Sequence, residues 1–157
     1  MVAEATTRRV LSLYDVRSFS SRDAVGARVA LARKAIKEEF GRELEPLGLS
    51  VQQALVLILV GEHRAGTAAD MCRQLSHDAG AMTRLVDKLE SMGLARRVRG
   101  AHDRRSARLE LTTEGRRMYG RVMRVQVDVL NRMLRGFSRS EVRTLERLLE
   151  QIVENAA

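Results

Sequence analysis

The sequence predicts a mainly helical fold of the α+β class, with one small β-hairpin among amphipathic helices. Apolar residues recur every three or four positions along most of the 157 residues, which is the period of a helix face. The composition is 45% hydrophobic but only 3% aromatic, which favours an aliphatic core between packed helices. One proline and 11 glycines leave few residues for the many turns of an all-β fold. The length fits a single domain.

The first helical pattern follows an irregular start. Residues 1–20 show no clean period, and they form either a loose arm or a short helix. From Ser21 onward, apolar residues recur at helical spacing, among them Val25, Val29 and Phe40. This long amphipathic helix should end by Pro46, because the residue before a proline is driven away from the helical region.

Two capping boxes mark the next two helices. Ser50 and Gln53 form the first box, before the apolar run at residues 54–60. By β-propensity this run also fits a buried strand, but the cap favours a buried helix. Thr67 and Asp70 form the second box, and the short helix that they begin should end near Ser76.

The stretch from residue 77 to residue 115 combines a helix with a basic hairpin. Asp78 is a favourable N-cap, and Leu85 and Leu89 recur on one side of the helix that follows it. Gly93 should end this helix, because glycine readily adopts the left-handed conformation. The next basic side chains are Arg97, Arg99, His102, Arg104, Arg105 and Arg108. Residues 109–112 then alternate apolar and polar as a half-buried strand does, which predicts a hairpin with a cationic tip.

Two helices joined by a tight turn and followed by a cationic hairpin are the parts of a winged helix-turn-helix, in that order. The turn would consist of Ser76, His77 and Asp78. In such a motif the second helix enters the major groove of duplex DNA, and the hairpin reaches phosphates or a minor groove. On charge alone a solvated basic loop is an equal alternative, but the order of the parts favours DNA recognition.

Two further amphipathic helices are predicted after the hairpin. Thr112 or Thr113 caps the first, and Ser138 and Glu141 form a capping box before the second. Their apolar faces either fold back on the core of the same chain or form a homodimer interface together with the first long helix. Dimerisation is favoured by the large amount of apolar surface on these helices, and two-fold symmetry also matches DNA half-sites about 34 Å apart.

The charge and composition limit the classes of partner. A formal net charge of +8 favours an anionic partner, either nucleic acid or a membrane surface. No signal peptide is visible and residues 54–60 are too few to cross a bilayer, so we expect no membrane partner and a cytoplasmic location. No aromatic side chain lies between Arg96 and Leu111, which argues against single-strand binding by base stacking. Double-stranded DNA is the expected partner, and non-specific or architectural nucleic-acid binding is the alternative.

The chain carries no catalytic motif of the HExxH, P-loop, GxGxxG or GxSxG type, so we expect neither enzymatic activity nor a cofactor. Metal ligation by Cys72, His77 and Asp78 matches no standard zinc spacing, and no metal site is expected. Cys72 is the single cysteine, which excludes an internal disulfide. A small buried residue is a better interpretation of Cys72 than a redox switch.

Five motifs follow one another within residues 24–153: LGLS at 47–50, GAMTRLVDKLE at 80–90, GL at 93–94 with RR at 96–97, DRR at 103–105, and LTTEG at 111–115. Through these motifs the chain resembles the MarR family of transcriptional regulators. Each is weak alone, but their order along the chain is specific. The resemblance implies one MarR-like domain over residues 1–157. Its helical dimerisation stem would comprise residues 1–46 and 114–157, and its winged helix-turn-helix lobe residues 50–113.

The resemblance also implies a function. The chain would be a sequence-specific regulator, acting as a repressor and as a homodimer on a palindromic operator, and released by a small effector such as an aromatic acid. Oxidant-sensing members use a reactive cysteine in the N-terminal helix, and this chain has none there. Peroxide sensing by that route is therefore not expected, and no sequence pattern identifies an effector pocket.

The expected roles in DNA binding follow from the same resemblance. In the wing, Asp103 would hold the hairpin and Arg105 would enter the minor groove, with Arg104 and Arg108 as phosphate partners. On the recognition helix the first exposed residues are small, Arg84 is the best candidate for a guanine or phosphate contact, and Met82 packs inward. The full set of expected DNA-binding residues is Ala79, Gly80, Ala81, Thr83, Arg84, Lys88, Arg97, Asp103, Arg104, Arg105 and Arg108.

Overall fold

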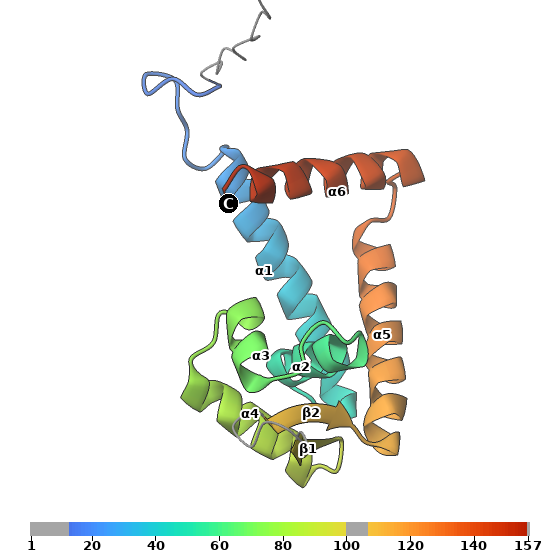
Figure 1. Ribbon diagram of the computed structural model, residues 1–157. Coiled ribbons are helices and arrows are strands. Elements are labelled where there is room, and N and C mark those ends of the chain that lie inside the picture. Colours follow the sequence, from blue (N-terminus) through green and yellow to red (C-terminus); the bar gives the residue numbers. More distant parts are fainter. Residues whose placement is uncertain (1–12, 100–106, 157) are drawn as a thin grey trace, which may run out of the picture. The chain divides into compact units, whose positions relative to one another are not determined.

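The computed structural model describes residues 13–99 and 107–156, and it has the predicted class of fold (Figure 1). The elements are α1 (Val25–Leu44), the 3₁₀ turn η1 (Glu45–Leu47), α2 (Val51–Gly61), α3 (Ala68–Leu75), α4 (Ala79–Ser91), β1 (Ala95–Arg99), β2 (Ala107–Leu111), α5 (Thr113–Met133) and α6 (Arg139–Glu154). A mainly helical chain with one small two-stranded sheet is therefore confirmed. The predicted wing tip, which includes Asp103, Arg104 and Arg105, lies outside the described residues.

The chain divides into two compact units, Met1–Ala35 and Ile36–Ala157. The division into a stem and a DNA-binding lobe stays a prediction. Among the described helices, none alone is long and apolar enough to span a membrane. Only the bent pair Val25–Leu47 and Val51–Gly61, taken together, meets the requirement, by length and composition alone.

In the first unit, the predicted start of the long helix is slightly early. Residues 13–24 form turns and bends, so the described part of the N-terminal arm holds no short helix, and α1 begins at Val25 rather than at Ser21. The reason is a local turn. The Asp23 backbone N–H donates to the Ser20 carbonyl at 3.1 Å, and the Ser20 hydroxyl donates to the Asp23 carboxylate at 2.8 Å.

Capping boxes begin α2, α3 and α6, as the sequence predicts. In each box a hydroxyl accepts from the backbone N–H three residues later, and the side chain of that later residue accepts from the backbone of the cap. The pairs are Ser50 with Gln53, Thr67 with Asp70, and Ser138 with Glu141. The apolar run at residues 54–60 is thus part of a buried helix, and the strand alternative is excluded.

The core of the second unit is built around α2 and is aliphatic. Its large, fully buried side chains include Leu44, Val56, Leu57, Met71, Met82, Leu89 and Val122, contributed by five helices. The hairpin adds the buried side chains of Leu109 and Leu111 on one face. Fully burying an aliphatic side chain contributes about 1.5–3 kcal/mol, so this set holds α3, α4 and the hairpin against α2.

The hairpin has a regular antiparallel register, from Ala95 opposite Leu111 to Arg99 opposite Ala107. A third backbone segment, which no sequence pattern predicts, pairs with the hairpin. The Leu109 N–H donates to the Gly66 carbonyl at 2.9 Å, and Thr67 forms an isolated bridge with Arg108. The loop before α3 therefore acts as a short additional strand beside β2.

The junction between the hairpin and α5 depends on main-chain contacts. The Thr112 hydroxyl donates to the Gly93 carbonyl at 2.6 Å, and the Thr112 N–H donates to the Leu94 carbonyl at 3.1 Å. Gly115 lies so close that a β-carbon there would stand 1.8 Å from the Leu94 oxygen. Thr112 also caps α5, since its hydroxyl accepts from the Gly115 N–H at 3.0 Å.

The two C-terminal helices differ in how much apolar surface they bury. In α5, the residues Gly115, Met118, Val122 and Val129 are buried, whereas α6 has no buried residue. The exposed apolar side chains of α6 are Leu145, Leu148, Leu149, Ile152 and Val153, and Phe137 is exposed just before it. The sequence allows these helices either to fold back on the core or to form a dimer interface. Because α6 has no buried residue, folding back on the core is not observed for it.

Candidate nucleic-acid interface

The start of α4 is fixed by the carboxylate of Asp78. Its Oδ1 atom accepts from the Ala81 N–H at 2.8 Å, which satisfies one of the free N–H groups at a helix N-terminus. This hydrogen bond, together with one from the Gly80 N–H and the charge of Arg84, holds the pKa of Asp78 below its ordinary value. The predicted N-cap is confirmed, and it sets the direction in which α4 leaves the turn.

The turn between α3 and α4 lies where the sequence places it. Ser76 ends α3 in the left-handed region at a φ of 52°, and the His77 N–H donates to the Cys72 carbonyl at 3.1 Å. The His77 ring nitrogen Nδ1 lies 2.7 Å from the Leu75 carbonyl oxygen, so the ring folds back on α3. Cys72 itself is half-buried and packs against the core.

The outer face of α4 carries the small and cationic residues predicted for it. Ala79, Gly80, Thr83, Arg84 and Lys88 are exposed, and Ala81 is half-buried. The inward orientation of Met82 is confirmed, since its side chain is fully buried. A β-carbon at residue 80 would stand 3.2 Å from the Asp78 Oδ1 atom, so glycine there also leaves room for the N-cap.

Among the cations of the hairpin, Arg108 is exposed and rests on a glycine. A β-carbon at Gly66 would meet its Nε and Nη2 atoms at 3.2 Å, which places the guanidinium directly over the loop before α3. Arg108 has no ion pair with a described residue. On the same sheet, Arg96 pairs with Glu110 across the strands at 3.0 Å.

Arg97 differs from the other cations because it is bound to two carboxylates of α4. Its Nη2 atom lies 2.6 Å from Asp87 Oδ1, its Nη1 atom binds Glu90 Oε2, and its backbone N–H donates to Glu90 Oε1 at 2.8 Å. The family resemblance implies a DNA contact for Arg97, and the sequence predicts neither of these partners. Glu90 lies one turn after Asp87, at the spacing that places both on one side of a helix.

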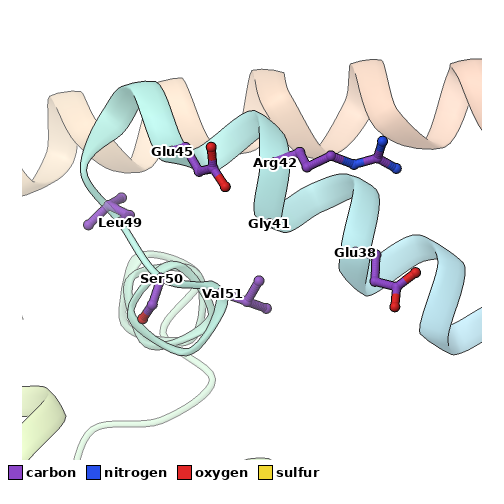
Figure 2. Close-up of a pocket in the computed structure, with 7 residues that line it drawn as sticks. All are labelled: Glu38, Gly41, Arg42, Glu45, Leu49, Ser50 and Val51. Carbon is purple, nitrogen blue, oxygen red and sulfur yellow. The ribbon is translucent and has the colours of Figure 1, made fainter.

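A surface hollow of about 690 Å³ lies beside α1 and the start of α2, and none of the residues predicted to bind DNA lines it (Figure 2). Its lining residues are Glu38, Gly41, Arg42, Glu45, Leu49, Ser50 and Val51. The Arg42 guanidinium already binds Glu39, and two carboxylates line the hollow, so an organic anion gains no open cation there. Among the described residues, no three His, Cys, Asp or Glu side chains gather as metal ligands.

Comparison with known proteins gives the family. The model of the MarR family matches residues 47–106. The organic hydroperoxide resistance transcriptional regulator of Bacillus subtilis is 36% identical over 72 residues, which cover 46% of this chain and about half, 49%, of that protein. The multiple antibiotic resistance protein MarR of Escherichia coli is 30% identical over 111 residues, which cover 70% of this chain and 77% of that protein.

Solved structures agree with the sequence comparison. The crystal structure of the transcriptional regulator PA3341 superposes with a TM-score of 0.77 at 30% identity, over 85% of this chain and 98% of that one. A mutant of E. coli MarR, solved with operator DNA, superposes with a TM-score of 0.72 at 26% identity, over 81% of this chain and 91% of that one. These relatives are regulators rather than enzymes, which supports a non-enzymatic role at the level of the family. With the helix-turn-helix and the base of the wing in place, the chain belongs to the MarR family of DNA-binding transcriptional regulators.

Proposed function

We propose that this regulator is a repressor that binds a palindromic operator as a homodimer and is released by a small ligand. The observation that carries the proposal is the exposed face of α4. Small residues at its start leave room for close approach to base edges, and Arg84 and Lys88 lie beyond them without an ion pair to any described residue. A helix with this pattern suits the major groove.

The proposed contacts assign one role to each part of the site. Ala81 contacts a thymine methyl group, and Arg84 contacts guanine or phosphate. Arg108 contacts a phosphate beside the loop that holds it, and in the wing tip Arg105 enters the minor groove while Arg104 contacts a phosphate. The remaining α4 positions, Ala79, Gly80, Thr83 and Lys88, face the groove, and Asp103 holds the tip. The E. coli relative solved with operator DNA supports this use of the fold.

The homodimer is supported by apolar side chains that the described chain leaves exposed. They lie on α1, at the end of α5 and along α6, and include Val25, Val29, Met133, Phe137, Leu145 and Ile152. Isolated exposed apolar residues are common, but a continuous apolar side on an amphipathic helix marks an interaction surface. A two-fold dimer would present two α4 helices about one turn of DNA apart.

A small effector is supported by a hollow beside the recognition helix. This hollow has a volume of about 290 Å³ and is lined by Gln52, His77, Ala81, Arg84 and Leu85. An aromatic acid there would place its carboxylate on Arg84 and its ring on Leu85, and so cover residues proposed to contact DNA. Benzoate should then release the operator complex in a fluorescence anisotropy titration, and release unaffected by Arg84→Gln would refute this location.

The proposed function is tested by selecting bound duplexes from a random DNA pool at near-physiological salt. The expected result is an inverted repeat whose half-sites lie about 10 base pairs apart. The regulator should then silence a reporter gene placed behind the recovered site. Raised expression of the reporter would show that the protein is an activator and not a repressor. Tight binding with no enriched sequence would favour the second candidate, non-specific or architectural binding, which the charge of +8 also permits.

A further inference from the structure

We propose that Arg97 is a positioning residue that fixes the angle between the wing and the recognition helix, and that it does not bind DNA phosphate. The proposal rests on the operator binding proposed above and identifies what orients the two elements that perform it. It is carried by the contacts of Arg97 on β1 with Asp87 and Glu90 on α4, here named the Arg97 clamp.

The clamp holds the main chain of β1 as well as a side chain. Glu90 uses one carboxylate oxygen for the Arg97 backbone N–H, at 2.8 Å, and the other for its guanidinium. Asp87 binds the second guanidinium nitrogen at 2.6 Å. Hydrogen bonds to ionised groups are short and strong, and planar guanidinium groups bind carboxylates in a fixed geometry. The strand itself is therefore anchored to α4 at Arg97, its middle residue.

The charges of the clamp disfavour a contact between Arg97 and DNA. Two carboxylates and one guanidinium sum to a charge of −1, so their combined field repels a phosphate. A phosphate that binds Arg97 would also lie beside Asp87 and Glu90, whose two charges Arg97 neutralises only in part. Arg108 has no ion pair with a described residue, so no bound carboxylate disfavours a phosphate contact there.

Because β1 pairs with β2, the contacts of Arg97 also position the second strand of the wing. Arg97 is opposite Leu109, which is buried and whose N–H donates to the Gly66 carbonyl at 2.9 Å. The next pair in the register is Val98 with Arg108. A two-stranded hairpin is marginally stable by itself, so its direction is set by the elements that hold it. Here α4 holds the described part of the hairpin through Arg97, and the loop before α3 holds it through Leu109.

The first experiment neutralises one acid of the clamp and compares it with a matched acid outside it. The probe is the duplex recovered from the random pool, and the protein is the full chain. By charge alone, Glu90→Gln should tighten binding, because it removes a negative charge close to DNA. The clamp predicts the opposite, a loss of about five- to thirtyfold in affinity. Glu110→Gln makes the same charge change on β2 instead of α4. Among the described residues Glu110 pairs only with Arg96, so this variant should bind as tightly as the wild type or tighter.

The second experiment separates positioning from phosphate binding by salt dependence. Arg97→Lys keeps the charge, but one ammonium group cannot reproduce the guanidinium that spans Asp87 and Glu90. We expect lower affinity for Arg97→Lys, with an unchanged slope of log affinity against log salt. Arg108→Ala should instead lower that slope by about one unit for each phosphate that the arginine binds. Circular dichroism on each variant establishes the temperature at which it is folded for these titrations.

The outcomes separate this proposal from the proposed function. If the wild-type chain enriches no duplex, sequence-specific binding is wrong and the positioning role is refuted with it. If the wild type enriches an operator but Glu90→Gln binds as tightly as Glu110→Gln, only the clamp is refuted. Full affinity of Arg97→Lys would also refute the clamp. A reduced salt slope in Arg97→Ala would refute it too, and would make Arg97 a phosphate ligand.

Discussion

Gly66 leaves just enough room for the Arg108 guanidinium that rests on it. A β-carbon at this position would lie 3.2 Å from both Nε and Nη2, closer than these atoms normally approach. Gly66→Ala should therefore displace Arg108 and weaken operator binding by about 1 kcal/mol, the upper end for an exposed ionic contact. Fluorescence anisotropy with the recovered operator measures the change. Gly120→Ala is the control, because nothing lies within 4 Å of its added carbon.

Unchanged operator affinity in Gly66→Ala would show that the position of Arg108 does not matter for binding. The Leu109 hydrogen bond to the Gly66 carbonyl uses the main chain, so the substitution leaves it in place. Thermal unfolding should therefore change little, and a large fall in the melting temperature would point to a role in folding instead.

Substitution of Gly115 should be more disruptive, because an added β-carbon would meet backbone atoms of Leu94, which cannot rotate away as the end of a side chain can. A β-carbon would stand 1.8 Å from the Leu94 carbonyl oxygen, so either α5 or the start of the hairpin must move. We expect Gly115→Ala to lower the free energy of unfolding by about 3 kcal/mol, the upper end for overpacking a close contact. Urea denaturation followed by circular dichroism measures this change.

The matched substitution on the same helix should have the opposite effect. Gly120→Ala replaces a mid-helix glycine in an open position and should raise the free energy of unfolding by about 1 kcal/mol, through helix propensity alone. Equal effects of the two substitutions would contradict the close approach of Gly115 to Leu94.

At the scale of elements, the start of α4 depends on an ionised carboxylate. The hydrogen bond from the Ala81 N–H is the main cause that lowers the pKa of Asp78, followed by the Gly80 N–H and the charge of Arg84. A lowered pKa in the folded state means that the stabilisation is complete above the ordinary pKa of the carboxyl group. It is lost as the pH falls through the lowered value.

The prediction compares the wild type with Asp78→Asn, which keeps a capping side chain but does not titrate. As the pH falls from about 6 to about 3, across the ordinary range for aspartate, the wild type should lose stability relative to the variant. Urea denaturation at each pH measures the free energy of unfolding of both proteins. Asp70 and Glu141 also have lowered carboxyl pKa values, but they are present in both proteins, so their contributions cancel in the difference. Parallel curves for the two proteins would show that the charge of Asp78 does not hold α4.

The elements that the sequence predicts well are those with local signals. The capping boxes at Ser50, Thr67 and Ser138 lie within four residues of chain, and the structure confirms each one. Gly93 has the predicted left-handed conformation, with a φ of 68°. Such features are specified by neighbouring residues, so they are visible without knowledge of the fold.

The contacts that the sequence does not reveal join residues from different elements. Arg97 is one arginine in a basic stretch, and its composition gives no sign that two acids of α4 bind it. The strand-like pairing of Gly66 with Leu109 likewise joins positions far apart in the chain. A helical pattern with acids at residues 87 and 90, followed after the helix by an arginine, is the only signal that could have indicated the clamp. The wing-tip roles of Asp103, Arg104 and Arg105 remain predictions.

At the scale of the whole molecule, the exposed apolar side of α6 predicts a dimer. Leu145 and Leu149 are one helical turn apart and are 40% and 38% exposed, although leucine favours burial. The double variant Leu145→Arg with Leu149→Arg should shift the protein from dimer to monomer in sedimentation velocity at micromolar concentration. Its operator affinity should fall sharply, because each half-site would then be bound independently.

The control for this experiment adds the same charge without changing the apolar side. Glu146→Arg replaces an exposed acid between the two leucines and should leave the sedimentation coefficient at that of the wild type. A wild-type protein that sediments as a monomer, or a leucine variant that remains a dimer, would exclude α6 from the interface. Either result would also remove the support for two bound half-sites.

The main-chain contacts at the start of α5 allow the helices that follow Val129 to be exchanged without disturbing the elements that read DNA. Thr112 and Gly115 hold the carbonyl groups of Gly93 and Leu94 through backbone proximity and one hydroxyl, so the far end of α5 contributes nothing to this joint. A chimera that exchanges everything after Val129, a buried residue of α5, for the matching helices of another family member should keep its DNA-reading surface unaltered. Mutations beyond this point can therefore accumulate without changing the contacts made to one half-site, while the dimer still sets the spacing of the two half-sites.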